Sequence, residues 1–96
     1  MTYNLPKRAE SDIISLASRC GLHKVILFGS RARGDNHERS DIDLAIQGGN
    51  TTRFSLDADD EVYTLLFFDI VDLEKPVQPE LLKEIERDGV VLYEKV

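Results

Sequence analysis

The chain has little of what marks a secreted or membrane-spanning protein. Its 96 residues include one cysteine, Cys20, so no disulfide can form within it, and a reducing compartment is expected. No apolar run approaches the ~20 residues that cross a bilayer, and the first residues lack the apolar core of a secretory signal. We therefore expect a cytoplasmic protein with no membrane partner.

Positive charge is also scarce. The sequence has 12 lysines and arginines against 18 aspartates and glutamates, which gives a formal net charge of −6. Proteins that coat nucleic acids need a basic face for the phosphates, so this composition argues against a general nucleic-acid binder. It leaves open a nucleotide bound at one local site through metal ions. The length suits one domain over 1–96 with a modest core.

Hydrophobic periodicity and turn residues predict alternating helices and strands. The expected elements are a helix over 8–20, a strand over 24–28, a short helix in the turn that follows, a strand over 41–46, a helix over 51–62, a strand over 64–73, a helix over 79–89 and a strand over 90–96. This order predicts an α/β (α+β) fold: a mixed sheet of about four strands, covered by helices mainly on one face. We expect the last strand at a sheet edge.

Two carboxylates interrupt the predicted strand "DIDLAI". Because side chains alternate between the faces of a strand, Asp41 and Asp43 share one face, about 7 Å apart at Cα, while Ile42 lies on the other. Asp69 interrupts the apolar run "FFDIVDL" in the same way. If the two strands are neighbours, Asp69 can join the same face. Asp72 has the other parity and is expected to be exposed.

Three carboxylates on one face repel each other, and without a counter-ion at least one pKa should rise. Mg²⁺ prefers oxygen ligands and binds through a few carboxylates plus substrate phosphates. Two such ions can hold the attacking and leaving oxygens of an in-line displacement at phosphorus. The alternative is a set of ordinary aspartates on a solvated strand face. Aspartate is depleted in strands, which favours the metal site.

A Gly-Ser turn precedes the aspartate strand, with ten residues between Ser30 and Asp41. Gly29 lets the backbone approach a ligand closely, and Ser30 adds a hydroxyl. Arg31 and Arg33 add guanidinium groups that suit phosphate oxygens. The alternative is a plain strand-to-helix turn with solvated arginines. The position of the turn before an Asp-x-Asp strand favours a nucleotide-binding role.

The three stretches "FGSRARG", "SDIDLAI" and "FFDIVDL" together resemble the minimal nucleotidyltransferases of the DNA polymerase β superfamily. That family has an apolar residue, Gly-Ser, about ten residues, Asp-apolar-Asp-apolar, and a third Asp on a later strand. The resemblance extends over nearly the whole chain and implies a nucleotidyltransferase-like fold.

The resemblance also implies roles for the site residues. Gly29 and Ser30 would hold the triphosphate of ATP, with phosphate contacts from both turn arginines. Asp41 and Asp43 would bind two Mg²⁺ ions. Asp69 would complete one metal site and help to activate the acceptor hydroxyl. The implied reaction is transfer of AMP from ATP to a hydroxyl, chiefly through positioning and charge neutralisation.

Chains that resemble this one are commonly antitoxins paired with HEPN-type toxins. The resemblance therefore implies that the protein adds AMP to a tyrosine of such a toxin and silences it. Two alternatives stay open. The chain could neutralise its partner by binding alone, without turnover. It could instead modify a small molecule such as an aminoglycoside, whose positive charge would suit an acidic protein.

Overall fold

The structure, a computed structural model, describes residues 3–96. Within this range the elements are α1 (Lys7–Arg19), β1 (Lys24–Phe28), α2 (Gly29–Arg33), β2 (Ile42–Gln47), α3 (Thr51–Glu61), β3 (Phe68–Asp72), α4 (Pro79–Asp88) and β4 (Val90–Glu94). None of these helices has the length and apolar character needed to cross a bilayer. The alternation of helices and strands agrees with the expected order.

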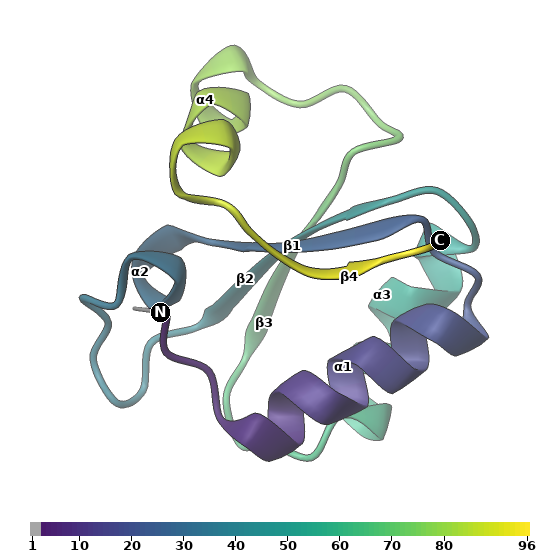
Figure 1. Ribbon diagram of the computed structural model, residues 1–96, viewed down its shortest axis with the longest axis horizontal. Coiled ribbons are helices and arrows are strands. Elements are labelled where there is room, and N and C mark those ends of the chain that lie inside the picture. Colours follow the sequence, from purple (N-terminus) through teal and green to yellow (C-terminus); the bar gives the residue numbers. More distant parts are fainter. Residues whose placement is uncertain (1–2) are drawn as a thin grey trace.

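The strands form one mixed sheet in the order β3-β2-β1-β4 (Figure 1). β1 runs antiparallel to both β2 and β4, whereas β2 and β3 are parallel. Parallel neighbours need a crossover connection, and α3 supplies it between β2 and β3. The expected four-stranded mixed sheet is confirmed, with β4 at an edge.

The main core lies between one face of the sheet and the helices α1 and α3. Ile13 and Leu16 of α1 and Phe54 of α3 are buried in one cluster with Ile42 and Leu44 of β2. These side chains are removed from water almost completely, and each contributes about 1.5–3 kcal/mol relative to exposure. Because Ile42 and Leu44 point into this core, alternation directs Asp43 of β2 to the other face.

The helix α4 covers the opposite face of the sheet (Figure 1). Its buried Ile85 clusters with Phe28 of β1 and Ala45 of β2. The two longest helices share one face, as expected, and α4 is the exception. Ala45 lies two residues after Asp43 on the same face, so the face that carries Asp43 is partly covered by α4.

The third strand is shorter than expected. The prediction of a strand over 64–73 was wrong for its first part, because β3 begins at Phe68, the register partner of Ile42. Residues before Phe68 would have to pair with the polar loop that precedes β2, and this loop is not a strand. Among residues 64–67, which were predicted as strand but lie before β3, Leu65 and Phe67 have large apolar side chains that are 100% and 75% exposed.

Candidate active site

The sheet brings two of the three predicted aspartates side by side. Asp43 of β2 is the register partner of Asp69 of β3, and neighbouring strands lie about 5 Å apart. Asp41 immediately precedes β2 and has the same parity as Asp43. Asp43 is half-buried, whereas Asp41 and Asp69 are exposed. The arrangement therefore combines one sheltered carboxylate with two that solvent can reach.

The environment of Asp43 disfavours its charged form. Burial, followed by repulsion from Asp69, Asp41 and Glu84, raises the pKa of Asp43 to about 6, and Arg33 opposes this shift. An elevated pKa is the expected result of crowding carboxylates without a counter-ion. Glu84 belongs to α4, and the sequence reasoning missed it. Nothing in the local pattern of "PELLKEIERDG" shows that this helix covers the aspartate face.

The donor set is one that suits a hard cation, although it does not form a complete cage. Within residues 3–96, no three carboxylate, histidine or cysteine side chains are arranged closely enough to hold a metal ion by themselves. Mg²⁺ sites in nucleotide-processing proteins commonly use one or two carboxylates, with phosphates and water as the other ligands. Asp43 and Asp69 fit this incomplete pattern, and Asp41 lies within two residues of Asp43.

The Gly-Ser turn lies directly against the acidic strand. Phe28, the last residue of β1, is the register partner of Asp43, and α2 begins at the next residue. Gly29 has φ +76, and a β-carbon built on it would overlap Oδ2 of Asp43. Glycine is needed at this position for two reasons: other residues rarely adopt positive φ, and their Cβ would overlap the Asp43 carboxylate. Ser30 follows and is half-buried.

Arg31 has partners that the sequence did not reveal. Its side chain is 3% exposed, and its guanidinium donates three hydrogen bonds to the carbonyl oxygens of Ser40, Asn4 and Glu38. Burial lowers the pKa of Arg31, yet a guanidinium stays charged at neutral pH. Phosphate contact by Arg31 stays a prediction, and these three bonds weigh against it because they occupy the fork that a phosphate would need.

Arg33 lies on the solvent side of the same short helix. Its guanidinium donates to Asp35 at 3.1 Å and to Asp88 of α4 at 3.0 Å, and its side chain is 38% exposed. The bond to Asp88 links the Gly-Ser turn to the C-terminal end of α4. The pair with Asp35 is exposed on both sides, whereas the Asp88 side chain is only 9% exposed. Phosphate contact by Arg33 stays a prediction, and its partly exposed guanidinium is compatible with it.

Asp72, expected to be exposed, is half-buried and has a structural role. Its Oδ2 accepts a hydrogen bond from the Thr51 hydroxyl at 2.7 Å, and its Oδ1 accepts one from the Glu74 backbone N–H at 2.9 Å. These bonds tie the end of β3 to the start of α3. The expectation failed because the partner hydroxyl is 21 residues away along the chain.

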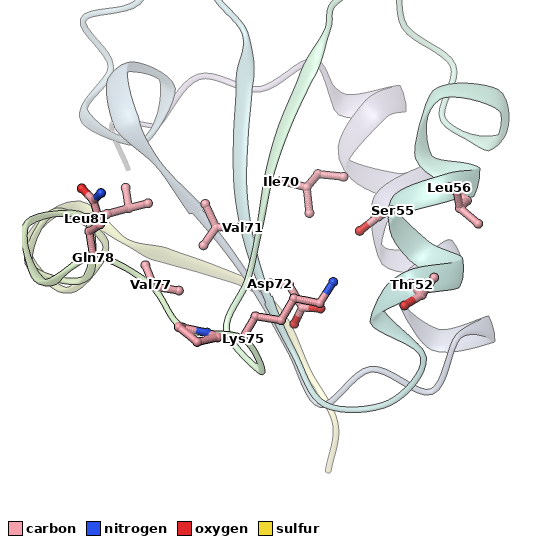
Figure 2. Close-up of a pocket in the computed structure, with 11 residues that line it drawn as sticks. Thr52, Ser55, Leu56, Ile70, Val71, Asp72, Lys75, Val77, Gln78 and Leu81 are labelled. Carbon is pink, nitrogen blue, oxygen red and sulfur yellow. The ribbon is translucent and has the colours of Figure 1, made fainter.

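A hollow of about 550 Å³ opens at the outer edge of β3 (Figure 2). Its walls come from α3, β3, the segment that leads into α4 and the first turn of α4, and they include Leu56, Ile70 and Leu81. None of the three predicted site aspartates lines it within the described part of the chain. The carboxylate cluster and this hollow are therefore separate features.

Comparisons with known proteins agree with this geometry. The sequence profile of the family described as "Polymerase beta, Nucleotidyltransferase" matches residues 11–96. A solved toxin–antitoxin complex with AMP-PNP contains a chain 25% identical, with a TM-score of 0.67 over 90% of this chain and 73% of that one. A variant of the toxin–antitoxin pair MntA-HpeT gives 26% identity and a TM-score of 0.69 over 96% and 75% of the two chains.

A third solved structure is described as a minimal nucleotidyltransferase. It is 31% identical to this chain, with a TM-score of 0.63, over 84% of this chain and 86% of its own length. No curated protein matches the chain.

Proposed function

Because the chain belongs to the polymerase β nucleotidyltransferase family, we propose that it is an antitoxin that transfers AMP from ATP to a hydroxyl of a HEPN-type toxin. The acceptor that we favour is a tyrosine of this partner. The observation that carries the proposal is the pairing of Asp43 with Asp69 beside the Gly29 turn. This places a carboxylate pair next to a backbone turn that can approach a triphosphate closely.

The chain's own residues divide the work of such a transfer. Asp41 and Asp43 would hold Mg²⁺, and Asp69 would complete one of two ion positions. Bound Mg²⁺ supplies neutralisation of the charge that builds up on the triphosphate. The backbone at Gly29 and the hydroxyl of Ser30 would orient the phosphates. The family pattern and the register of β2 and β3 support these assigned roles.

In this proposal Asp69 is the carboxylate that meets the acceptor. It is exposed, and it lies at the edge strand of the sheet, where a partner can approach. In the proposed step the acceptor oxygen bonds to the α-phosphorus, and the bond from this phosphorus to the bridging oxygen breaks. Pyrophosphate leaves, and the hydroxyl proton passes to Asp69 and then to water.

Exposed apolar side chains beside Asp69 support a protein acceptor. Leu65 and Phe67 precede Asp69, and together with Glu38 and Arg39 they line a hollow of about 320 Å³. Large exposed apolar side chains grouped in this way commonly mark protein interaction sites. The toxin–antitoxin complexes among the structural neighbours support a toxin as the partner.

One observation favours a second candidate, neutralisation by binding alone. The exposed apolar residues Leu65 and Phe67 could hold a partner without any turnover at the aspartates. The two candidates differ in one respect, which is whether the partner is covalently modified.

The deciding experiment is intact-mass spectrometry of a HEPN-type toxin encoded beside this protein, after incubation with it, ATP and Mg²⁺. We expect a mass increase of one or more AMP units, absent with Asp43→Asn. Asp59→Asn, an exposed substitution on α3, is the matched control and should retain activity. A stable complex without any mass increase would reject transfer and favour neutralisation by binding.

A further inference from the structure

Arg31 is almost completely buried, which is unusual for an arginine. Its Nε donates to the Ser40 carbonyl at 3.0 Å, its Nη2 to the Glu38 carbonyl at 3.1 Å, and its Nη1 to the Asn4 carbonyl at 3.2 Å. Each nitrogen of the guanidinium therefore has a backbone acceptor. A buried charge held in this way stabilises a particular arrangement of backbone segments.

Two of the three acceptors belong to the loop that leads into the acidic strand. This loop has its own internal bonds: the His37 N–H donates to the Ser40 hydroxyl at 2.8 Å, and the Ser40 N–H donates to the His37 carbonyl at 3.1 Å. Arg31 therefore holds a preformed turn. The Ser40 carbonyl that Arg31 binds belongs to the peptide bond between Ser40 and Asp41. The orientation of this peptide sets the direction of the backbone at Asp41.

The third acceptor anchors the other side of the guanidinium. The Asn4 N–H donates to the Arg31 carbonyl at 2.8 Å, while the Arg31 side chain donates to the Asn4 carbonyl. The backbone and the side chain of Arg31 thus both form hydrogen bonds with the segment before α1. Arg31 also follows Ser30 directly, so its own backbone belongs to the turn proposed to bind the triphosphate.

We propose that Arg31 is a positioning residue that fixes the Asp41 end of the acidic strand relative to the Gly29–Ser30 turn. The residue acts through the loop carbonyls and touches neither metal nor phosphate. Groups that orient metal ligands commonly affect metal affinity by about 10-fold to 100-fold when they are removed. The role in metal binding rests on the proposed site at Asp41 and Asp43, and it does not require that AMP transfer occurs.

Mn²⁺ titration provides the test, because Mn²⁺ can replace Mg²⁺ and its binding is read directly by electron paramagnetic resonance. We expect Arg31→Lys and Arg31→Met to weaken Mn²⁺ binding in the presence of AMP-PNP by about 10-fold or more. At saturating Mg²⁺, AMP-PNP affinity should stay within about twofold of wild type, because no phosphate contact is lost. Lysine supplies charge without the planar fork, so it should rescue only part of the loss.

Two further variants sharpen the comparison. Ser40→Ala removes the hydroxyl that closes the loop and should weaken Mn²⁺ binding in the same direction without touching the guanidinium. Arg53→Met on α3 is the control, because it removes an exposed arginine that pairs with Asp57 at 3.6 Å, away from the loop that Arg31 holds. We expect wild-type Mn²⁺ binding from this control.

The alternative roles give different results. Unchanged Mn²⁺ affinity in a folded Arg31→Lys variant, even with a lower Tm, would overturn the proposal and leave a purely structural role. A large loss of AMP-PNP affinity at saturating Mg²⁺ would overturn it in favour of phosphate contact. If wild type itself binds no Mn²⁺ with AMP-PNP, the proposed site at the aspartates fails, and the inference fails with it. Should Arg31→Met not fold, Arg31→Lys and Ser40→Ala still decide.

Discussion

The α-carbon of Gly29 lies against the carboxylate of Asp43, so closely that a β-carbon on Gly29 would overlap Oδ2 of Asp43. The cause is the antiparallel register of β1 and β2, which makes Phe28 the partner of Asp43 and places the turn after β1 over the start of β2. The turn proposed to bind the nucleotide and the strand proposed to bind the metal are therefore in direct contact. Changes at either residue should affect the other.

Gly29→Ala should damage stability and ligand binding together. The substitution combines positive φ with the overlap at Asp43, and we expect a loss of about 2–4 kcal/mol in the free energy of unfolding. The shift in Tm on adding ATP and Mg²⁺ should also disappear, because the carboxylate is displaced. Urea denaturation and thermal melting with and without ATP and Mg²⁺ measure both effects.

Gly21→Ala is the matched control for this prediction. Gly21 also has positive φ, +67, but a β-carbon there meets nothing within 4 Å. The control should lose only the backbone contribution, about 1 kcal/mol, and retain the ligand-dependent shift in Tm. Equal losses from the two variants would show that contact with Asp43 is not what requires glycine at position 29.

Neutralising the sheltered carboxylate should stabilise the protein while removing ligand binding. Asp43→Asn removes the repulsion from Asp69 and Asp41 and a partly buried charge, so we expect about 1–2 kcal/mol more stability at pH 7 without metal. The double variant Asp41→Asn/Asp43→Asn should lose the shift in Tm caused by ATP and Mg²⁺. A full ligand-dependent shift in the double variant would place the site elsewhere.

The elevated pKa of Asp43 predicts an unusual dependence of stability on pH. The folded protein binds this proton more tightly than the unfolded chain, whose aspartate pKa is about 3.9. The contribution of Asp43 to stability is therefore fully present below about pH 4 and is lost as pH rises through about 6. Asp69, Asp41 and Glu84 raise this pKa together with burial, and Arg33 opposes them.

Urea denaturation between pH 4 and pH 7 checks this sign. The difference in stability between wild type and Asp43→Asn should grow by about 1–2 kcal/mol across this range in metal-free buffer, because the substitution removes the titrating group. In saturating Mg²⁺ and ATP, the stability of wild type should fall less between pH 4 and pH 7, since bound cations favour the charged carboxylate. The difference from Asp43→Asn should then grow less across this range. A constant difference across the range would mean that the pKa of Asp43 is not elevated.

The faces of the acidic site could be predicted from the sequence, but the helix that covers it could not. The alternation of side chains along a strand identified the shared face of Asp41 and Asp43, and a parallel register then placed Asp69 beside them. Such local periodicity is readable without coordinates. The neighbourhood of Asp43 also depends on Glu84, whose helix lies over the opposite face from α1 and α3, and no local pattern specifies this docking (Figure 1).

The two arginines of the turn show the same limit. Arg31 and Arg33 look equivalent in "GSRARG", and both were expected at phosphate. One is buried against three carbonyls, and the other is paired with Asp35 and Asp88 at the surface. The acceptors for Arg31 are backbone atoms, which every residue carries, so the sequence contains no signal for them.

Arg33→Gln should therefore separate stability from nucleotide affinity. Its pair with Asp35 is exposed, and Asp88, although only 9% exposed, keeps Arg87 as a partner at 2.9 Å, so the loss of stability should be less than about 1 kcal/mol. If Arg33 contacts a phosphate, the affinity for ATP at saturating Mg²⁺ should fall by about 10-fold, the usual value of one charge-assisted bond. Isothermal titration calorimetry measures the affinity. The exposed Arg39 of the neighbouring loop provides Arg39→Gln as the control, which should leave ATP affinity unchanged.

The last prediction concerns the exposed apolar residues next to Asp69. Leu65→Ala with Phe67→Ala removes the two large side chains, 100% and 75% exposed, without disturbing the core, so the Tm should change little. Binding of ATP and Mg²⁺ should persist, while transfer of AMP to the toxin should fall by at least about 10-fold, because a few well-packed anchor side chains carry most of the binding energy of a protein interface.

Leu56→Ala is the control for this pair. Leu56 is also exposed, 67%, but it lines the separate hollow at the outer edge of β3 (Figure 2). Its removal should leave modification of the toxin at the wild-type rate, since it lies outside the group beside Asp69. If Leu56→Ala reduces modification and the Leu65/Phe67 pair does not, the partner binds at the hollow, and the acceptor hydroxyl must reach Asp69 from that side.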